Sequence, residues 1–90
     1  MSDDMKVVEA ASDDRGRQDW ALKSRRYIKR ELKQREITYE QLADRLSEMG
    51  IQETPGSIAM KVARGLYPAW FFFAVMRAIG SQQMRFEDLG

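Results

Sequence analysis

The feature of this sequence most able to do chemistry is a concentration of positive charge. Residues 15–35 contain nine basic and two acidic side chains, a net charge of +7, although the whole 90-residue chain carries only +1. The nine bases are Arg15, Arg17, Lys23, Arg25, Arg26, Lys29, Arg30, Lys33 and Arg35. Charge of one sign on one segment is the expected footprint of a site for a polyanion.

The residue types needed for most catalysis and metal binding are missing. The sequence contains no cysteine and no histidine, so it has no disulfide framework, no thiolate metal site and no imidazole general base. Glu40 and Asp44 stand four residues apart, but like-charged carboxylates at this spacing are typical of a solvated helix face. We therefore expect a binding protein, not an enzyme, with no cofactor and no metal.

The basic segment has the periodicity of a helix over residues 19–35. At about 100° per residue, Ala21, Ile28 and Leu32 fall on one face. The other side carries a basic stripe bordered by Trp20 and Tyr27, namely Lys23, Arg26, Lys29, Arg30 and Lys33. A solvated face normally mixes the two signs of charge, whereas Glu31 is almost the only acid here. The stripe is either a solvated surface or a polyanion-binding face.

Three further helices are predicted, over residues 38–49, 55–64 and 68–79. Thr38 and Gln41 form a capping box, and Thr54 before Pro55 is a second helix start. A glycine follows each helix: Gly50, Gly65 and Gly80. Residues 81–90 predict a short helical turn, with a short strand as the alternative. The predicted fold class is therefore all-α, a compact domain of four to five helices.

The apolar positions of these helices predict the core. The residues expected to be buried are Ile28, Leu32, Leu42, Leu46, Ile58, Val62, Phe72, Val75 and Ile79. The stretch from Trp70 to Met76 is apolar nearly all round, so its helix is either central to the core or partly an oligomer contact.

The chain divides into a tail and one domain. Residues 1–17 predict a disordered acidic tail, because their first fourteen carry Lys6 against five acids. Residues 18–90 form the helical domain. The start of the chain lacks the basic and apolar regions of a signal peptide, and residues 69–76, the longest apolar run, are too few to cross a membrane. We expect a soluble, cytoplasmic protein.

The order of these elements resembles the Cro/repressor-type (lambda-repressor-like) helix-turn-helix family. The resemblance is carried by the sequences ITYEQLA at 37–43 and TPGSIAMKVARG at 54–65, by Ile79-Gly80, and by the closing turn at 86–89. The chain also looks similar to a group of short bacterial proteins of unknown function. The spacing from Ala43 to Ile58 is longer than that family's usual one.

The resemblance implies a helix-turn-helix layout and a DNA-binding regulator of transcription. Phosphates would be contacted by the first helix, through Lys23, Arg26, Arg30 and Lys33. The third helix would enter the major groove with Thr54, Ser57 and Lys61. Arg64 would contact phosphate or bond the last carbonyls of its own helix. Because such proteins often read paired half-sites, and the fourth helix is so apolar, a homodimer is expected.

A protein–protein interaction module, for example a small bacterial adaptor or regulator, is the alternative. It rests on four consecutive aromatic residues at positions 70–73, which one face of a small helical domain cannot easily bury. Trp70 and Phe73 would then be the first residues of a protein interface. The other interpretation is that all four residues build the core.

Overall fold

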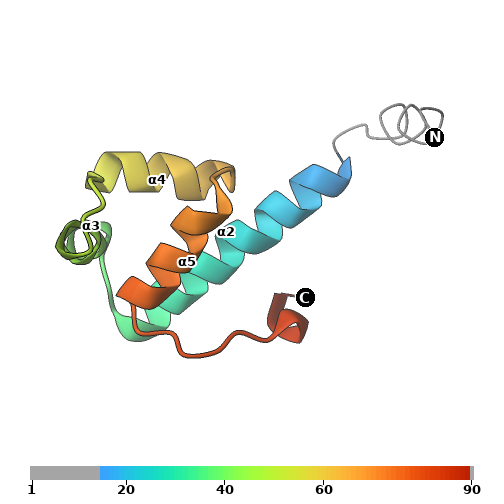
Figure 1. Ribbon diagram of the computed structural model, residues 1–90. Coiled ribbons are helices and arrows are strands. Elements are labelled where there is room, and N and C mark those ends of the chain that lie inside the picture. Colours follow the sequence, from blue (N-terminus) through green and yellow to red (C-terminus); the bar gives the residue numbers. More distant parts are fainter. Residues whose placement is uncertain (1–14, 90) are drawn as a thin grey trace, which may run out of the picture.

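Four α-helices and a short 3-10 helix make up the computed structural model, which describes residues 15–89 (Figure 1). The elements are α2 (Arg15–Arg35), α3 (Tyr39–Glu48), α4 (Pro55–Arg64), α5 (Ala69–Ala78) and η1 (Phe86–Leu89). No strand occurs between residues 15 and 89, so the predicted all-α class is confirmed. In the same range no helix is long and apolar enough to cross a membrane.

The predicted start of the first helix, Asp19, is wrong by four residues. The helix begins at Arg15, whereas the prediction followed an apolar pattern that starts only at Trp20. Of the tail predicted for residues 1–17, only 15–17 are described, and they are helical. The rest of that tail lies outside the described residues.

Capping boxes fix the starts of α3 and α4. Thr38 caps α3 in a capping box, with the Gln41 amide donating to Thr38 Oγ1 (3.1 Å) and the Thr38 amide to Gln41 Oε1 (2.9 Å). Thr54 caps α4, and Pro55 is its first residue. The C-terminal segment forms a helical turn at η1, as predicted, and not a strand.

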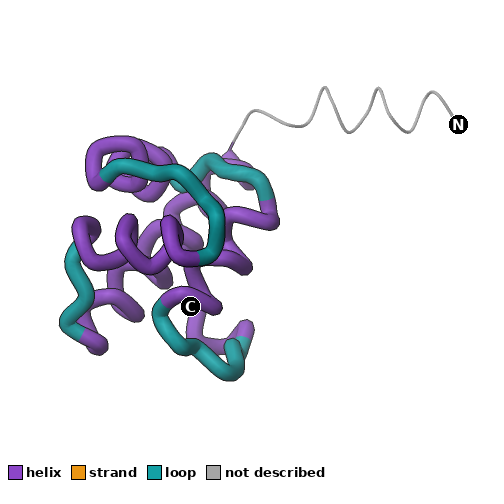
Figure 2. The backbone as a smooth tube through the Cα atoms, turned by 60° about the vertical axis from the view of Figure 1, so that its left-hand side comes forward, coloured by secondary structure: helices purple, strands orange, loops and turns teal. Residues whose placement is uncertain are grey.

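Helix α2 is the longest element, and α4 and η1 pack against it while α3 packs on α4 and α5 (Figures 1 and 2). Eight of the nine predicted core residues are buried, all except Phe72. Phe71 is fully buried in its place, because it shares the inward side of α5 with Val75 and Ile79 at spacings of four. Phe72 lies at the edge, half-buried, with its ring centroid 6.2 Å from that of Tyr27.

At Gly65, the end of α4 packs very closely against α2. Its φ is +65°, the left-handed region that favours glycine. A Cβ at this position would lie 2.3 Å from the carbonyl oxygen of Ala21, a backbone atom that cannot move aside. Only glycine allows α4 and α2 to approach in this way, and the turn that follows leads directly into α5.

Candidate functional site

The basic stripe of α2 is a solvent-exposed surface. Arg26, Lys29 and Lys33 are exposed, and within residues 15–89 none of them forms an ion pair or a hydrogen bond. Positions three, four and seven apart lie on one side of a helix, so these cations form a continuous ridge. We call this surface, with Lys23 and Arg30 at its border, the basic face.

The two border cations lie on aromatic rings. Lys23 Nζ is 4.6 Å from the centroid of the Trp20 ring, and Arg30 Cζ is 5.2 Å from that of Tyr27. Arg30 Nη2 also donates to the main-chain oxygen of Asp88 (3.0 Å), which ties η1 to α2. Tyr27 was expected only to border the stripe, but it is buried. Burial, followed by the charge of Glu31, raises the pKa of its hydroxyl.

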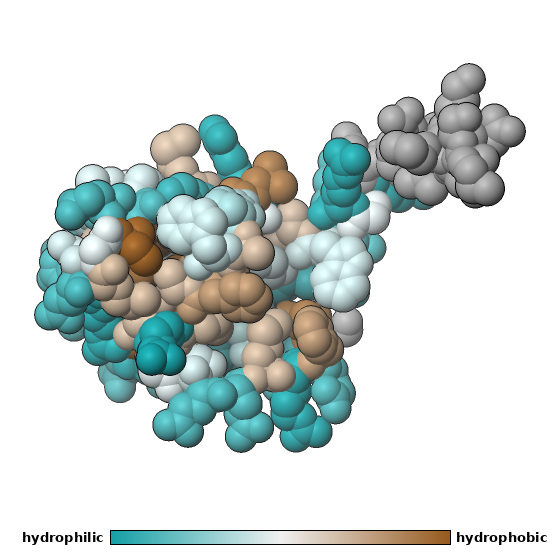
Figure 3. Space-filling model, viewed as in Figure 1, coloured by the Kyte–Doolittle hydropathy of each residue, from teal (hydrophilic) through white to brown (hydrophobic). Residues whose placement is uncertain are grey.

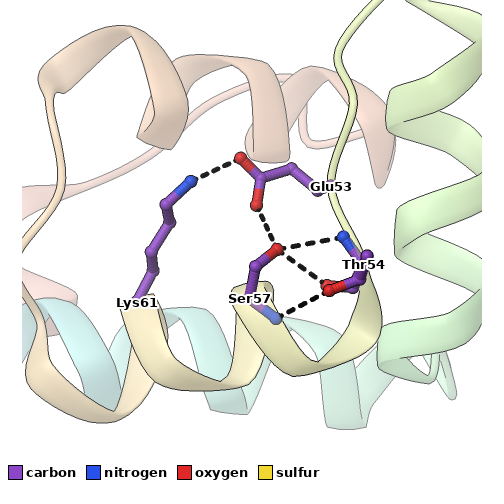
Figure 4. Close-up of polar contacts among 4 residues, drawn as sticks. All are labelled: Glu53, Thr54, Ser57 and Lys61. Atoms are coloured by element: carbon purple, nitrogen blue, oxygen red, sulfur yellow. Dashed lines mark hydrogen bonds and ion pairs between the residues drawn. The ribbon is translucent and has the colours of Figure 1, made fainter.

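Three residues predicted to face DNA bases, Thr54 at the cap of α4 and Ser57 and Lys61 along it, lie around an acid that the sequence analysis did not identify (Figure 4). Ser57 Oγ donates to Glu53 Oε1 (2.6 Å), and Lys61 Nζ forms an ion pair with Glu53 Oε2. The Ser57 amide donates to Thr54 Oγ1 (3.0 Å), and the Thr54 amide to Ser57 Oγ (2.9 Å). These polar groups are therefore satisfied within the chain.

Glu53 is ionised in this arrangement. Burial opposes its charge, but hydrogen bonds from Lys61 and Ser57 and the charge of Lys61 outweigh burial and hold the pKa of Glu53 below its usual value. Only 6% of its side-chain surface is exposed, against 35% for Lys61. The sequence held only part of the signal for this cluster: Ser57 and Lys61 are four residues apart and share one side of α4, whereas Glu53 precedes the helix.

Arg64 is the fourth predicted DNA contact of α4, and it is exposed. Neither a bond to the last carbonyls of its helix nor an ion pair occurs for it between residues 15 and 89. The rest of the outer side of α4 is poor in polar groups, with Gly56, Ala63 and a 57% exposed Met60.

A groove of about 480 Å³ opens between the first half of α2, the α4–α5 turn, the start of α5 and the C-terminal segment. We call it the aromatic groove, after the rings that line it: Trp20, Tyr27, Tyr67, Phe72, Phe73 and Phe86. The Ser24 and Tyr67 hydroxyls, both in its lining, are hydrogen-bonded to each other. Burial raises the pKa of Tyr67, although this bond lowers it.

Several large side chains of the aromatic groove are mostly exposed. Phe73 is 68% exposed, Phe86 75%, Leu66 66% and Trp20 58%. Of the two residues predicted for a protein interface, Phe73 lines the groove and Trp70 does not, although Trp70 is also exposed. Trp20, Leu66 and Phe86 were not predicted as interface residues from the sequence, because they come from three separate segments of the chain.

Metal binding has no candidate among residues 15–89, since no group of three or more acidic, histidine or cysteine side chains could hold an ion there. The two candidate binding sites that we consider on the described surface are the basic face and the aromatic groove.

Comparison with known proteins corrects the family suggested by the sequence. No curated protein and no solved structure matches the chain. One family model does match, over residues 20–84, and it is not a Cro/repressor-type helix-turn-helix family, so that resemblance is wrong as a family assignment. Because the match covers well over half of the sequence, the chain belongs to the family described as Domain of unknown function (DUF6471).

Proposed function

We propose that this protein binds DNA through the basic face of α2, chiefly by contacts with phosphate groups. The observation that carries the proposal is the ridge of Arg26, Lys29 and Lys33, which is exposed and has no acidic partner within residues 15–89. Cations that replace the counterions of a nucleic acid supply most of the affinity of sequence-independent binding. Lys23 and Arg30 extend the surface on one side.

Helix α4 supports this binding less directly. Arg64 is available for a phosphate, because it makes no hydrogen bond or ion pair between residues 15 and 89. Lys61 and Ser57, in contrast, would have to leave Glu53 before they could reach a base edge, and Glu53 would then be left buried without its partners. We therefore propose a DNA-binding regulator whose affinity comes from contacts with the phosphate groups of DNA. Its preference for one base sequence over another should be small.

A salt-dependent titration of the full chain with duplex DNA tests the proposal. Fluorescence anisotropy should show binding at low salt, with log K falling linearly with log salt concentration. The variant Arg26→Glu/Lys29→Glu should weaken binding to every sequence alike, and should flatten the salt dependence by roughly one unit of slope for each lost contact.

The matched control changes net charge by the same amount elsewhere. Arg77→Glu/Arg85→Glu alters two exposed basic residues outside α2. Within residues 15–89, the only ion pair or side-chain hydrogen bond that it breaks is the exposed pair of Arg85 with Glu87 at 3.3 Å. This variant should keep the salt slope of the wild type. Absence of binding at low salt, or equal losses of slope in both double variants, would show that the basic face is only a solvated surface.

A further inference from the structure

The aromatic groove takes no part in the proposed DNA binding, and several of its large apolar side chains are mostly exposed. We propose that it is the contact surface between two copies of this chain. A fully exposed aromatic side chain presents about 150–250 Å². Trp20, Phe73 and Phe86 are each more than half exposed, so together they present roughly 400 Å². A standard interface buries about 800 Å² per partner, and these three side chains alone would supply about half of it.

The shape of the groove suits pairing with an identical surface. Phe73 and Phe86 protrude with most of their surface in solvent, while Tyr67 and Tyr27 are drawn in toward the core beside them. One face thus carries both a hollow and projecting rings. In a two-fold dimer the same patch is used twice, so the rings of each copy can enter the hollow of the other. Figure 3 shows apolar side chains gathered on this face over α5 and the C-terminal segment.

The scarcity of charged side chains in the groove also favours a second copy as its partner. Among the residues that the structure describes, Arg17 is the only charged one in its lining. Close to a two-fold axis every charged side chain would meet its own copy, and burying like charges is costly. Arg26, Lys29 and Lys33 do not belong to the lining, and Lys23 and Arg30 contact the rings of Trp20 and Tyr27 at its border. Two copies can therefore join with Arg26, Lys29 and Lys33 outside the contact.

Sedimentation of the full chain over a series of micromolar concentrations tests this assignment. The wild type should pass from 10.5 kDa to twice that mass. Phe73→Glu should raise the dissociation constant of the dimer about tenfold or more, because each copy would bury an unpaired carboxylate. Met60→Glu places the same charge at a 57% exposed position of α4 outside the groove lining and should leave the dimer intact.

Fluorescence supplies a second measurement at the groove itself. In a Trp70→Phe background, Trp20 is the remaining tryptophan, so its emission should move to longer wavelength as the protein is diluted and the groove opens to water. A chain that stays at 10.5 kDa throughout, or a dimer that Phe73→Glu and Met60→Glu affect equally, would overturn the assignment. So would a monomer whose DNA affinity falls with Phe73→Glu alone, because the groove would then belong to the DNA site.

Discussion

Glu53 decides what the polar residues of α4 can do. Its carboxylate holds Ser57 and Lys61, and Ser57 in turn completes the cap made by Thr54. A lysine that has an acidic partner presents little net charge to a ligand. The cluster therefore stabilises the start of α4 and at the same time removes Lys61 from the groups that are free to bind.

We expect Glu53→Gln to lower the free energy of unfolding by about 1 kcal/mol at neutral pH, since Lys61 is partly exposed and the pair is partly screened. The pKa of Glu53 is lowered by folding, so its contribution is present above the unfolded pKa of about 4.3 and is lost as the pH falls through the folded value. Urea unfolding at several pH values should show a weaker acid dependence for Glu53→Gln than for the wild type. Glu48→Gln, at an exposed carboxylate of α3, should not differ from the wild type in this respect.

At the scale of helices, most of the fold could be predicted from local signals. The bounds of α4 and the caps of α3 and α4 follow from threonine, proline and glycine, whose effects act within one turn of the chain. The choice between Phe71 and Phe72 could not be made, because an all-apolar helix has no periodicity to orient it.

The two candidate sites also differ in how far local sequence patterns could predict them. The basic face lies on one helix, so charge and a spacing of about 100° per residue were enough to find it. The aromatic groove is assembled from residues as far apart as Trp20 and Phe86. Its existence depends on how α2, the α4–α5 turn and η1 pack, and no local pattern contains that information.

The junction of α4 and α2 can be tested with Gly65, which caps the end of α4, and Gly56 in the first turn of that helix. We expect Gly65→Ala to lower the free energy of unfolding by about 2 kcal/mol or more, because the new Cβ meets the Ala21 carbonyl and the backbone is left-handed. Gly56→Ala, where the nearest atom is Thr54 Oγ1 at 3.8 Å, should be neutral or stabilise by about 0.5–1 kcal/mol. Denaturant unfolding measures both, and equal effects would mean that α4 does not approach α2 so closely.

At the scale of the whole molecule, α2 connects the two proposed sites. One side of its first half lines the aromatic groove through Trp20 and Ser24, and the adjacent side carries the basic face. A dimer formed through the groove would therefore hold two basic faces in a fixed relation. DNA that spans both would be bound by twice the number of cations in a single step.

This connection predicts that dimer formation and DNA affinity change together. Phe73→Glu should weaken DNA binding and reduce the salt slope toward that of one basic face, although it removes no cation. Met49→Glu adds the same negative charge at an exposed position after α3, outside the groove lining and the proposed phosphate contacts. It should have a much smaller effect, which separates loss of the dimer from simple repulsion. The reverse test uses Arg26→Glu/Lys29→Glu, which should lose DNA affinity while sedimenting as the wild type does. If Phe73→Glu abolishes the dimer but binds DNA with an unchanged salt slope, each copy binds alone and the two sites of α2 act independently.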